Sequence, residues 1–238
     1  MKIALIGYGK MGKAIEEIAS QRKHQIVLTI DQPNLDDFTK ENMMLADVAI
    51  EFTSPHTAFE NVKKCLEYDT AIVCGSTGWT ERMDEIKKLC SERNGSFIYS
   101  SNYSVGVNIF FEINKKLASL MAAHKDYEVI LEETHHTQKK DAPSGTAITL
   151  AEQVLETLTR KKRWVNELSD NPEDLEIISQ RIDPAPGIHH VKYSSAIDDI
   201  EIIHTAHNRK GFAFGAVMAA EFIKDKKGCF TMKDVLNL

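Results

Sequence analysis

Residues 2–12, KIALIGYGKMG, decide which fold the rest of the chain must fit. KIALI is a short apolar run without helical spacing, which predicts a buried parallel strand that ends at Gly7. GYGKMG at 7–12 matches the pattern G-x-G-x-x-G and leads into a stretch with helical spacing. Gly7 permits a tight turn, Gly9 lets a pyrophosphate approach the backbone, and Gly12 lets the helix pack closely on the strand. We therefore expect a dinucleotide at this helix N-terminus, although a glycine turn in an unrelated α/β fold would look the same.

Four more apolar runs follow, at 26–30, 48–52, 70–74 and 96–100, and helical stretches separate them. The helical stretch TAFENVKKCLEY comes just after Ser54-Pro55, which is a typical helix start. Strands that alternate with helices predict a parallel sheet with helices on both faces. The first part of the chain is therefore expected to form a Rossmann-like, doubly wound α/β domain.

The pattern changes in the second half of the chain. Its expected elements are helices at 107–124 and 146–162 and strands at 128–136, 175–182, 189–197 and 200–208. Consecutive strands with little helix between them predict a smaller α+β domain with a mostly antiparallel or mixed sheet. The apolar helix at 212–226 then returns to the first domain. We predict a dinucleotide-binding domain of residues 1–103 and 209–238, and an inserted substrate domain of residues 104–208.

The composition is that of an ordinary globular protein without a basic face. Twenty-nine basic and thirty-five acidic residues give a net charge of −6, which argues against nucleic acid or an anionic membrane as a partner. The four cysteines form no C-x-x-C pair, so we expect reduced thiols and neither a disulfide framework nor a zinc site. No apolar run is long enough to span a bilayer, and we expect a cytoplasmic protein.

Asp31 ends the second predicted strand, nineteen residues after Gly12. A carboxylate at this position can accept hydrogen bonds from the hydroxyl pair of an adenine ribose. It would repel a 2′-phosphate, and the residues that follow, Gln32, Pro33 and Asn34, supply no arginine. We therefore expect NADH to be used at least as well as NADPH.

Two polar segments follow the fourth and fifth strands, at the edge of the sheet where ligands of such folds bind. They are GSTGW at 75–79, which could equally be a plain turn, and SSNYSVG at 100–106, which is expected to combine cofactor contacts with the domain hinge. Together with the glycine turn they provide the candidate cofactor-binding residues. These are Gly7, Tyr8, Gly9, Lys10, Met11, Gly12, Asp31, Gly75, Ser76, Thr77, Ser100, Ser101, Asn102 and Tyr103.

The stretch HHTQKKDAPSGTA at 135–147 combines a proton carrier with features that attract anions. His135 and His136 end a predicted strand, so their side chains should point to opposite sides. Lys139 lies four residues after His135 on a loop, and its long side chain can reach a substrate. Pro143 and Ser144 predict a helix start, where the amides of Gly145 and Thr146 can bind a carboxylate.

A metal site is not expected in this stretch, because adjacent histidines rarely converge on one ion and no nearby cysteine or second histidine pair has ligand spacing. HTAHNRKG at 204–211 adds His204, His207 and Arg209. These side chains are either polar residues at a strand end or a second part of an anion pocket, and the sequence leaves both possibilities open.

The motifs together resemble the dihydrodipicolinate reductase family. Residues 133–147, ETHHTQKKDAPSGTA, match the family signature E-x-H-H-x-x-K-x-D-A-P-S-G-T-A at every defined position. GSTGW is similar to the family's G-T-T-G-[FW], and SSNYSVGVN to its N-[FY]-S-x-G-x-N. FTSPHTAFENVKKC is similar to its D-F-T-x-P segment, with Glu51 in place of the aspartate.

This resemblance implies an enzyme that reduces 4-hydroxy-tetrahydrodipicolinate with NADH or NADPH and loss of water, in the diaminopimelate route to lysine. It implies that His135 is the proton donor and Lys139 its partner acid. It further implies that His136, Gly145 and Thr146 hold the substrate carboxylates. Family members are commonly homotetramers built through the sheet of the second domain, and the same assembly is expected here.

The chain also departs from the family pattern. Its phosphate loop is one residue shorter than the commoner form, and QRIDPAPGIHHVKY stands where many members have G-E-H. The substrate contacts from residues 181–193 therefore stay undefined. One alternative is a two-domain NAD-dependent dehydrogenase for another small dicarboxylate or amino acid, and another is a regulator that senses NADH without turnover. Neither alternative accounts for the intact stretch from His135 to Thr146.

Overall fold

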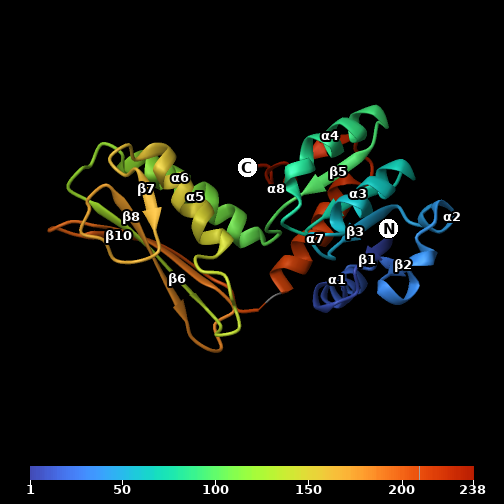
Figure 1. The fold of residues 1–238 in the computed structure, drawn as a ribbon, viewed down its shortest axis with the longest axis horizontal. Coiled ribbons are helices and arrows are strands. Elements are labelled where there is room, and N and C mark those ends of the chain that lie inside the picture. The colour runs from blue at the N-terminus through green and yellow to red at the C-terminus, as the bar shows by residue number, and fades with distance from the viewer. Residues whose placement is uncertain (209) are drawn as a thin grey trace. The chain divides into compact units, whose positions relative to one another are not determined.

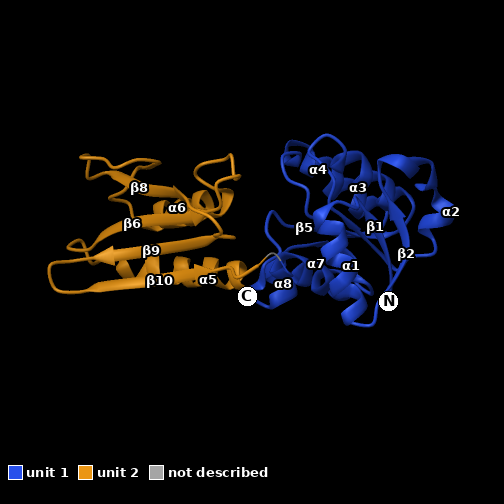
Figure 2. Cartoon of the chain, turned by 90° about the horizontal axis from the view of Figure 1, so that it is seen from below, with its two compact units in different colours: residues 1–105, 210–238 blue, residues 106–209 orange. Residues whose placement is uncertain are grey.

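The computed structural model describes residues 1–208 and 210–238, which form two compact units (Figure 1 and Figure 2). Unit 1 consists of Met1–Val105 and Lys210–Leu238, and unit 2 of Gly106–Arg209. The boundaries predicted from the sequence, after residues 103 and 208, differ from these by two residues and one residue.

Unit 1 is built on a six-stranded parallel sheet with strand order β11-β5-β4-β3-β1-β2. The strands are β1 (Lys2–Ile6), β2 (Gln25–Ile30), β3 (Val48–Glu51), β4 (Ala71–Cys74), β5 (Ser96–Tyr99) and β11 (Gly228–Phe230). The five strands expected from the apolar runs are present. β11 was missed because its three residues, GCF, are too short to show a pattern.

Helices cover both faces of this sheet (Figure 1). The longer ones are α1 (Lys10–Gln21), α3 (Ala58–Glu67), α4 (Met83–Glu92) and α7 (Lys210–Ile223). The shorter ones are η1 (Gln32–Asp37), α2 (Lys40–Met43), η2 (Thr80–Arg82) and α8 (Met232–Leu236). Apolar residues of α1 and α7 share one buried cluster, and those of α3 and α4 share the cluster on the opposite face. The Rossmann-like fold expected from the sequence is therefore confirmed, and α7 returns to it from the second half of the chain.

Unit 2 is a mixed five-stranded sheet, in the order β10-β9-β6-β8-β7, with two helices on one face (Figure 2). The strands are β6 (Glu128–His135), β7 (Arg163–Val165), β8 (Asp174–Arg181), β9 (Ile188–Ser194) and β10 (Asp199–Thr205), and the helices are α5 (Val105–Met121) and α6 (Gly145–Thr157). β6, β8 and β7 pair in parallel, whereas β9 pairs antiparallel with both β6 and β10. The expected mixed sheet is confirmed, and only the short strand β7 was missed.

On the face of this sheet that packs against the helices, a row of apolar side chains is followed directly by a row of polar ones. One row across the paired strands is apolar and consists of Ile177, Leu131, Val191 and Ile202. The row two residues further along β6 is polar and consists of Ser179, Glu133, His189 and His204. Because side chains alternate along a strand, Glu133 and His135 continue the same inward-facing stripe as Leu131. Glu133 and His135 therefore lie at the end of the buried core.

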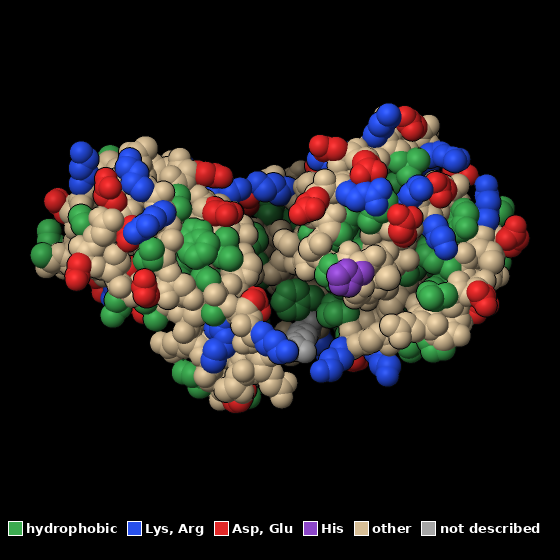
Figure 3. Space-filling model, viewed as in Figure 1, with side chains coloured by type: hydrophobic (Ala, Val, Ile, Leu, Met, Phe, Trp, Pro, Cys, Tyr) green, Lys and Arg blue, Asp and Glu red, His purple; other side chains and the backbone are tan. Residues whose placement is uncertain are grey.

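None of the helices in residues 1–208 and 210–238 is both long enough and apolar enough to cross a membrane. On the face seen in Figure 3, acidic and basic side chains are interspersed over the surface. This distribution agrees with the balanced composition, in which acidic residues slightly outnumber basic ones.

Candidate active site

A cavity of about 460 Å³ opens in unit 1 where β1, β3 and β4 end. The start of α1 and the loops after β3 and β4 provide its lining residues. They are Gly9, Lys10, Met11, Phe52, Thr53, Ser54, Pro55, Gly75, Ser76 and Thr77. Six of the predicted cofactor residues thus lie together at the carboxyl edge of the sheet. Residues 52–55 were missed, because Ser54-Pro55 was interpreted only as a helix start.

The three glycines of the first turn are required for different reasons. Gly7 has a φ of +92°, and a Cβ there would lie 2.1 Å from the carbonyl oxygen of Phe52. A Cβ on Gly12 would lie 2.3 Å from the carbonyl oxygen of Gly7, so this glycine allows α1 to pack closely on the turn. A Cβ on Gly9 would meet no atom within 4 Å. Packing therefore explains Gly7 and Gly12, whereas Gly9 borders open space suited to a phosphate group.

A buried carboxylate, Glu51, organises the rim of the same cavity. It accepts hydrogen bonds from the Thr53 amide (2.9 Å), the Ser76 hydroxyl (2.9 Å) and the Cys74 thiol (2.9 Å). The Thr53 amide also donates to the Ser76 hydroxyl at 2.8 Å. Burial, and then the charge of Glu51, raise the pKa of the Cys74 thiol well above its usual range, so this cysteine stays a thiol donor. Glu51 thus ties the loop after β3 to the loop after β4.

Asp31 lies just after β2, as expected, and caps the short helix η1. Its carboxylate accepts hydrogen bonds from the amides of Gln32 (2.9 Å) and Tyr8 (3.3 Å). The contact with Tyr8 joins Asp31 directly to the glycine turn. Among the described residues, no lysine or arginine forms an ion pair with Asp31.

Residues 100–103, predicted to contact the cofactor, follow β5 and are held by local hydrogen bonds. The side chain of Tyr103, predicted to contact the cofactor, is buried, and its hydroxyl donates to the carbonyl of Cys74 at 2.8 Å. Ser100 donates to the carbonyl of Asn102 at 2.7 Å, and Asn102 accepts from the Ser104 amide at 2.8 Å. The large side chain of Tyr103 fills the core beside α7, and the residue as a whole is only 1% exposed.

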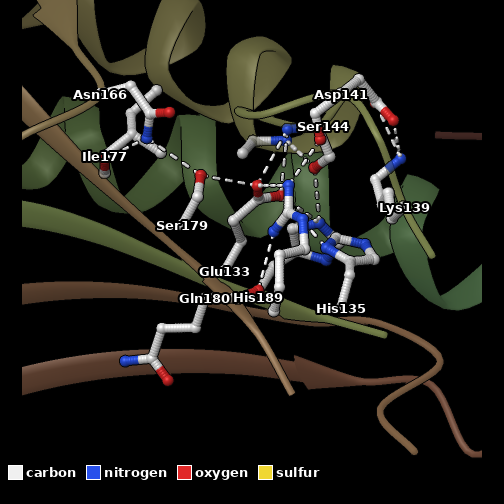
Figure 4. A network of polar contacts seen from close by, with 12 residues as sticks. Glu133, His135, Lys139, Asp141, Ser144, Asn166, Ile177, Ser179, Gln180 and His189 are labelled. Atoms are coloured by element: carbon white, nitrogen blue, oxygen red, sulfur yellow. Dashed lines mark hydrogen bonds and ion pairs between the residues drawn. The ribbon is translucent and has the colours of Figure 1, made fainter. Parts of the chain in front are cut away.

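In unit 2 the end of β6 places His135 on the buried side, whereas His136 is only partly buried. This outcome follows the alternation expected for a strand. Lys139 lies on the loop that follows, and its ammonium is 2.9 Å and 2.8 Å from the two carboxylate oxygens of Asp141. Figure 4 shows Lys139 paired with Asp141 and apart from His135. Burial alone would raise the pKa of Asp141, but the hydrogen bond from Lys139, a backbone hydrogen bond and the charges of Lys139 and Arg181 together outweigh burial and lower the pKa.

The carboxylate of Glu133 is the centre of this part of the structure (Figure 4). The Ser144 amide donates to both of its oxygens, at 3.0 Å and 3.1 Å, and the Ser179 hydroxyl (2.7 Å) and Arg181 (3.1 Å) donate to Oε1. Burial on its own raises the pKa of Glu133. Contacts with His135, Ser144 and Ser179 outweigh burial and hold the pKa far below its usual range, so Glu133 is ionised.

His135 lies beside the second oxygen of this carboxylate. Its Nδ1 is 3.3 Å from Glu133 Oε2, yet it has no partner in hydrogen-bond geometry among the described residues. Its Nε2 faces Gly187, where a Cβ would lie only 3.1 Å away, so a side chain at that position would crowd the imidazole. Glu133 thus provides a fixed negative charge next to the histidine predicted to carry a proton.

His189 is the third member of this group and was not predicted. Its ring centre lies 5.1 Å from that of His135, and its Nε2 is 3.2 Å from the Ser144 hydroxyl and 3.9 Å from Glu133 Oε2. Burial, and then the charge of His135, lower the pKa of His189 to about 3, so its ring is neutral near pH 7.

His204, whose role the sequence left open, continues the row on β10. Its ring lies 6.5 Å from His189 and 5.9 Å from Phe110, and burial lowers its pKa. It is thus part of the inward-facing polar row, whereas His207 is exposed beyond the end of β10. Arg209 lies outside the described residues.

The predicted helix start after Pro143 is confirmed. Ser144 is the N-cap of α6, and its hydroxyl accepts the Ala147 amide at 3.2 Å. Gly145 is exposed, and a Cβ there would meet no atom within 4 Å. As with Gly9 in unit 1, packing does not explain this glycine, and the space beside it is open to a ligand.

Ser179, Arg181 and His189 could not be found from the sequence, although each contacts Glu133 or its neighbours. Ser179 pairs with Glu133 across parallel strands, and His189 pairs with it across antiparallel strands. These pairings depend on strand register, which no local motif specifies. One hint was available, because residues 181–193 are where the chain departs from the family pattern.

Unit 1 is Rossmann-like and has a cavity at the carboxyl edge of its sheet, and unit 2 is a mixed α+β unit with a histidine–carboxylate site. This combination is that of a two-domain α/β oxidoreductase. Residues 1–103 match the family description "Dihydrodipicolinate reductase, N-terminus", and residues 106–236 match "Dihydrodipicolinate reductase, C-terminus". The chain belongs to the dihydrodipicolinate reductase family.

Individual relatives agree with this assignment. The chain is 48% identical to a protein named 4-hydroxy-tetrahydrodipicolinate reductase from Christiangramia forsetii, over 100% of this chain and 98% of the relative. It is 34% identical to a protein of the same name from Thermosipho africanus, with the same coverage. The structure of dipicolinate-bound dihydrodipicolinate reductase from Paenisporosarcina sp. TG-14 superimposes with a TM-score of 0.77 at 24% identity, over 97% of both chains. This last similarity supports the fold.

We predict that Gly9→Ala weakens cofactor binding without unfolding the protein. The added methyl group enters open space, so the free energy of unfolding should change by no more than about 1 kcal/mol. The methyl group would meet the pyrophosphate, so the KM for NADH should rise at least about tenfold. Thermal unfolding and initial-rate kinetics measure the two effects.

Gly12→Ala is the matched control, because its Cβ would meet the carbonyl oxygen of Gly7 at 2.3 Å. It should lower the free energy of unfolding by about 1–3 kcal/mol. If Gly9→Ala were destabilised as much as Gly12→Ala, or if it bound NADH normally, the open space beside Gly9 would not be the phosphate site.

Proposed function

We propose that this chain reduces 4-hydroxy-tetrahydrodipicolinate to tetrahydrodipicolinate with NADH or NADPH, in the diaminopimelate route to lysine. The net reaction consumes substrate, one reduced nicotinamide and one proton, and it yields product, oxidised nicotinamide and water. The observation that carries the proposal is the complete family signature, which places His135 at the end of β6, Lys139 on the loop after it and Ser144 at the start of α6. Full-length identity of 48% to a reductase of this name supports the same reaction.

Unit 1 fits a nicotinamide dinucleotide. The open space at Gly9 and the start of α1 suit the pyrophosphate, and Asp31 has lone pairs for the ribose hydroxyls. When bound, the nicotinamide supplies a hydride for ring carbon C4 of the substrate. Residues 52–55 and 75–77 then line the rest of the cavity, where Glu51 holds Ser76 and Thr53 in place.

His135 acts as the proton donor in this proposal, with Lys139 as its partner acid. The ionised Glu133 carboxylate fixes the His135 ring from its Nδ1 side. Buried Glu133 is itself fixed by Ser144 and Arg181, so the ring has a defined place before substrate binds. Proton delivery to the ring accompanies hydride addition and the loss of water.

The two substrate carboxylates are assigned to the start of α6 and to the cations near it. The amides of Gly145 and Thr146 lie in the first turn of α6, where the helix dipole favours an anion. His136 is partly buried at the end of β6 and provides a further polar contact. Lys139 is paired with Asp141, so a substrate carboxylate would compete with Asp141 for the ammonium.

Asp31 supports NADH as a cofactor used at least as well as NADPH. A 2′-phosphate at the adenine ribose would face this carboxylate, and no ion pair with a described lysine or arginine neutralises it. The acid therefore favours the ribose hydroxyls of NADH over the phosphate of NADPH.

Homotetramer formation through the sheet of unit 2 is part of the same proposal. Both helices of unit 2 pack on one face of this sheet. The other face carries His190 between Glu132 and Glu201, at 3.4 Å and 3.3 Å, and the exposed side chain of Ile203. Light scattering after size-exclusion chromatography should give about four times the chain mass of 26.8 kDa, and a monomer would contradict the assembly. We further propose a cytoplasmic enzyme that uses neither nucleic acid nor a membrane as a partner.

The direct test is a coupled assay with purified protein. Pyruvate and aspartate semialdehyde, with the preceding synthase, generate the substrate in place, and the absorbance of the reduced nicotinamide is followed. We expect rapid loss of absorbance that depends on the synthase, with kcat/KM for NADH at least equal to that for NADPH. No loss with a cofactor that binds would refute the reaction, and a large preference for NADPH would refute the role of Asp31.

The kcat and KM values of alanine variants distinguish the roles proposed for His135 and Lys139. His135→Ala should lower kcat by about 10²–10⁴-fold with little change in KM, because it removes help given in the transition state. Lys139→Ala should lower kcat and also raise KM, because Lys139 both assists the acid and binds a carboxylate. Near-normal turnover in both variants would show that the assignment of these roles is wrong.

Gly145→Ala tests the carboxylate site at the start of α6. Alanine is a better helix residue than glycine and its Cβ meets no atom here, so the unfolding free energy should stay equal or rise by up to about 1 kcal/mol. The KM for the dicarboxylate should nevertheless rise about tenfold or more, while the KM for NADH stays unchanged. An unchanged KM for the dicarboxylate would place its carboxylates elsewhere.

A further inference from the structure

Three atoms that commonly bind metal ions converge inside unit 2. They come from Glu133, His135 and His189, one atom from each residue, and all three atoms lie within 4.8 Å of one another. His135 Nδ1 is 3.3 Å and His189 Nε2 is 3.9 Å from the carboxylate oxygen. All three side chains are buried, and Figure 4 shows the two imidazoles gathered beside Glu133. Adjacent His135 and His136 do not converge, but His189 reaches His135 from the neighbouring strand.

These distances suit Zn²⁺. Zinc binds imidazole nitrogen at about 2.0–2.1 Å and carboxylate oxygen at about 2.0–2.2 Å, so neighbouring ligands of a tetrahedral ion lie about 3.4 Å apart. The separation of 3.3 Å already fits, and the separation of 3.9 Å requires a shift of about 0.5 Å. The two histidine atoms lie within 4.8 Å of each other, so they would have to approach by up to about 1.4 Å. Two histidines and one glutamate leave the fourth position for water, as in many open zinc sites.

The surroundings prepare these atoms to bind a cation. Glu133 is ionised, and Ser179 and Arg181 hold its other oxygen, Oε1, which leaves Oε2 facing the imidazoles. His135 Nδ1 is buried without a hydrogen-bond partner among the described residues. His189 is neutral, so its Nε2 can offer a lone pair once it exchanges the Ser144 hydroxyl for the ion.

The ligand set also selects the class of ion. Arg181, at 3.1 Å from Oε1, offsets part of the negative charge of Glu133. The site therefore has little to offer Ca²⁺ or Mg²⁺, which prefer several oxygen ligands. Imidazole nitrogen favours Zn²⁺ and its neighbours in the first transition series.

We infer that Glu133, His135 and His189 form a binding site for Zn²⁺ and that the bound ion inhibits the enzyme. The ion would engage His135, the residue that the proposed function makes the proton donor, so that His135 could no longer serve the substrate. Binding of the ion is independent of the proposed function, whereas the inhibition rests on it.

X-ray absorption at the zinc edge tests the site in the unaltered protein. Metal-free protein with one equivalent of Zn²⁺ should show only nitrogen and oxygen neighbours, at about 2.0–2.1 Å, with outer-shell scattering from two imidazoles. Sulfur at about 2.3 Å would place the ion on cysteine, and the absence of tight binding would exclude a site. Either result overturns the inference without the need for a variant.

His189→Asn and His204→Asn form a matched pair of variants. Both replace a histidine of the same polar row, but only His189 belongs to the converging group. Isothermal titration with Zn²⁺ should show affinity lowered at least about 100-fold by His189→Asn and unchanged by His204→Asn. Circular dichroism checks that both variants fold. Equal affinity in the two variants, or equal loss in both, would overturn the inference.

Inhibition is measured with the coupled assay, using a control that the synthase itself tolerates Zn²⁺. Micromolar-range Zn²⁺ should abolish reduction, a chelator should restore it, and His204→Asn should be inhibited like the wild type. If the protein binds Zn²⁺ as described but has no reductase activity, the site stands and the proposed function fails. If the active enzyme binds Zn²⁺ at this site without losing activity, the inhibitory role fails.

Discussion

The buried carboxylate of Glu133 is the constraint on which the site in unit 2 depends. It lies in the inward-facing stripe of β6, one step beyond the apolar residue Leu131. A buried charge is tolerated only where hydrogen bonds and ion pairs replace water. Glu133 finds these partners on three segments, at Ser144 before α6, at Ser179 and Arg181 on β8, and at His135 on its own strand. The need to satisfy one carboxylate therefore fixes the start of α6 beside His135.

In unit 1 a buried carboxylate likewise organises the residues around the cavity. Glu51 ends β3, is fully buried, and accepts hydrogen bonds from a backbone amide at Thr53 and a serine hydroxyl at Ser76. Glu133 likewise accepts from a backbone amide at Ser144 and from a serine hydroxyl at Ser179. In both units a carboxylate near the end of a strand ties a ligand-facing segment to the neighbouring strand or loop. Loops that must hold a ligand are thus fixed by polar contacts to a rigid sheet.

Sequence patterns predicted those features that depend on local spacing. GYGKMG predicted the turn before α1, and Pro143-Ser144 predicted the start of α6, because glycine and capping preferences act within a few residues. Features that depend on pairing between distant strands were missed. His189 reaches Glu133 only through the register of β9 on β6, and Tyr103 turned out to be a core residue because α7 packs over it. The ion pair between Lys139 and Asp141 was also missed, because the spacing of residues does not determine where a long side chain on a loop will point.

The polar row of unit 2 is difficult to explain by stability alone. Its neighbour on the same face, made of Ile177, Leu131, Val191 and Ile202, shows that apolar side chains fit this sheet and these helices. In the polar row, the Nδ1 atoms of His189 and His204 are buried without a hydrogen-bond partner among the described residues. Each such atom costs about 1–3 kcal/mol relative to a satisfied one. An apolar row would be more stable, so ligand binding explains a polar row at this position better than fold stability does.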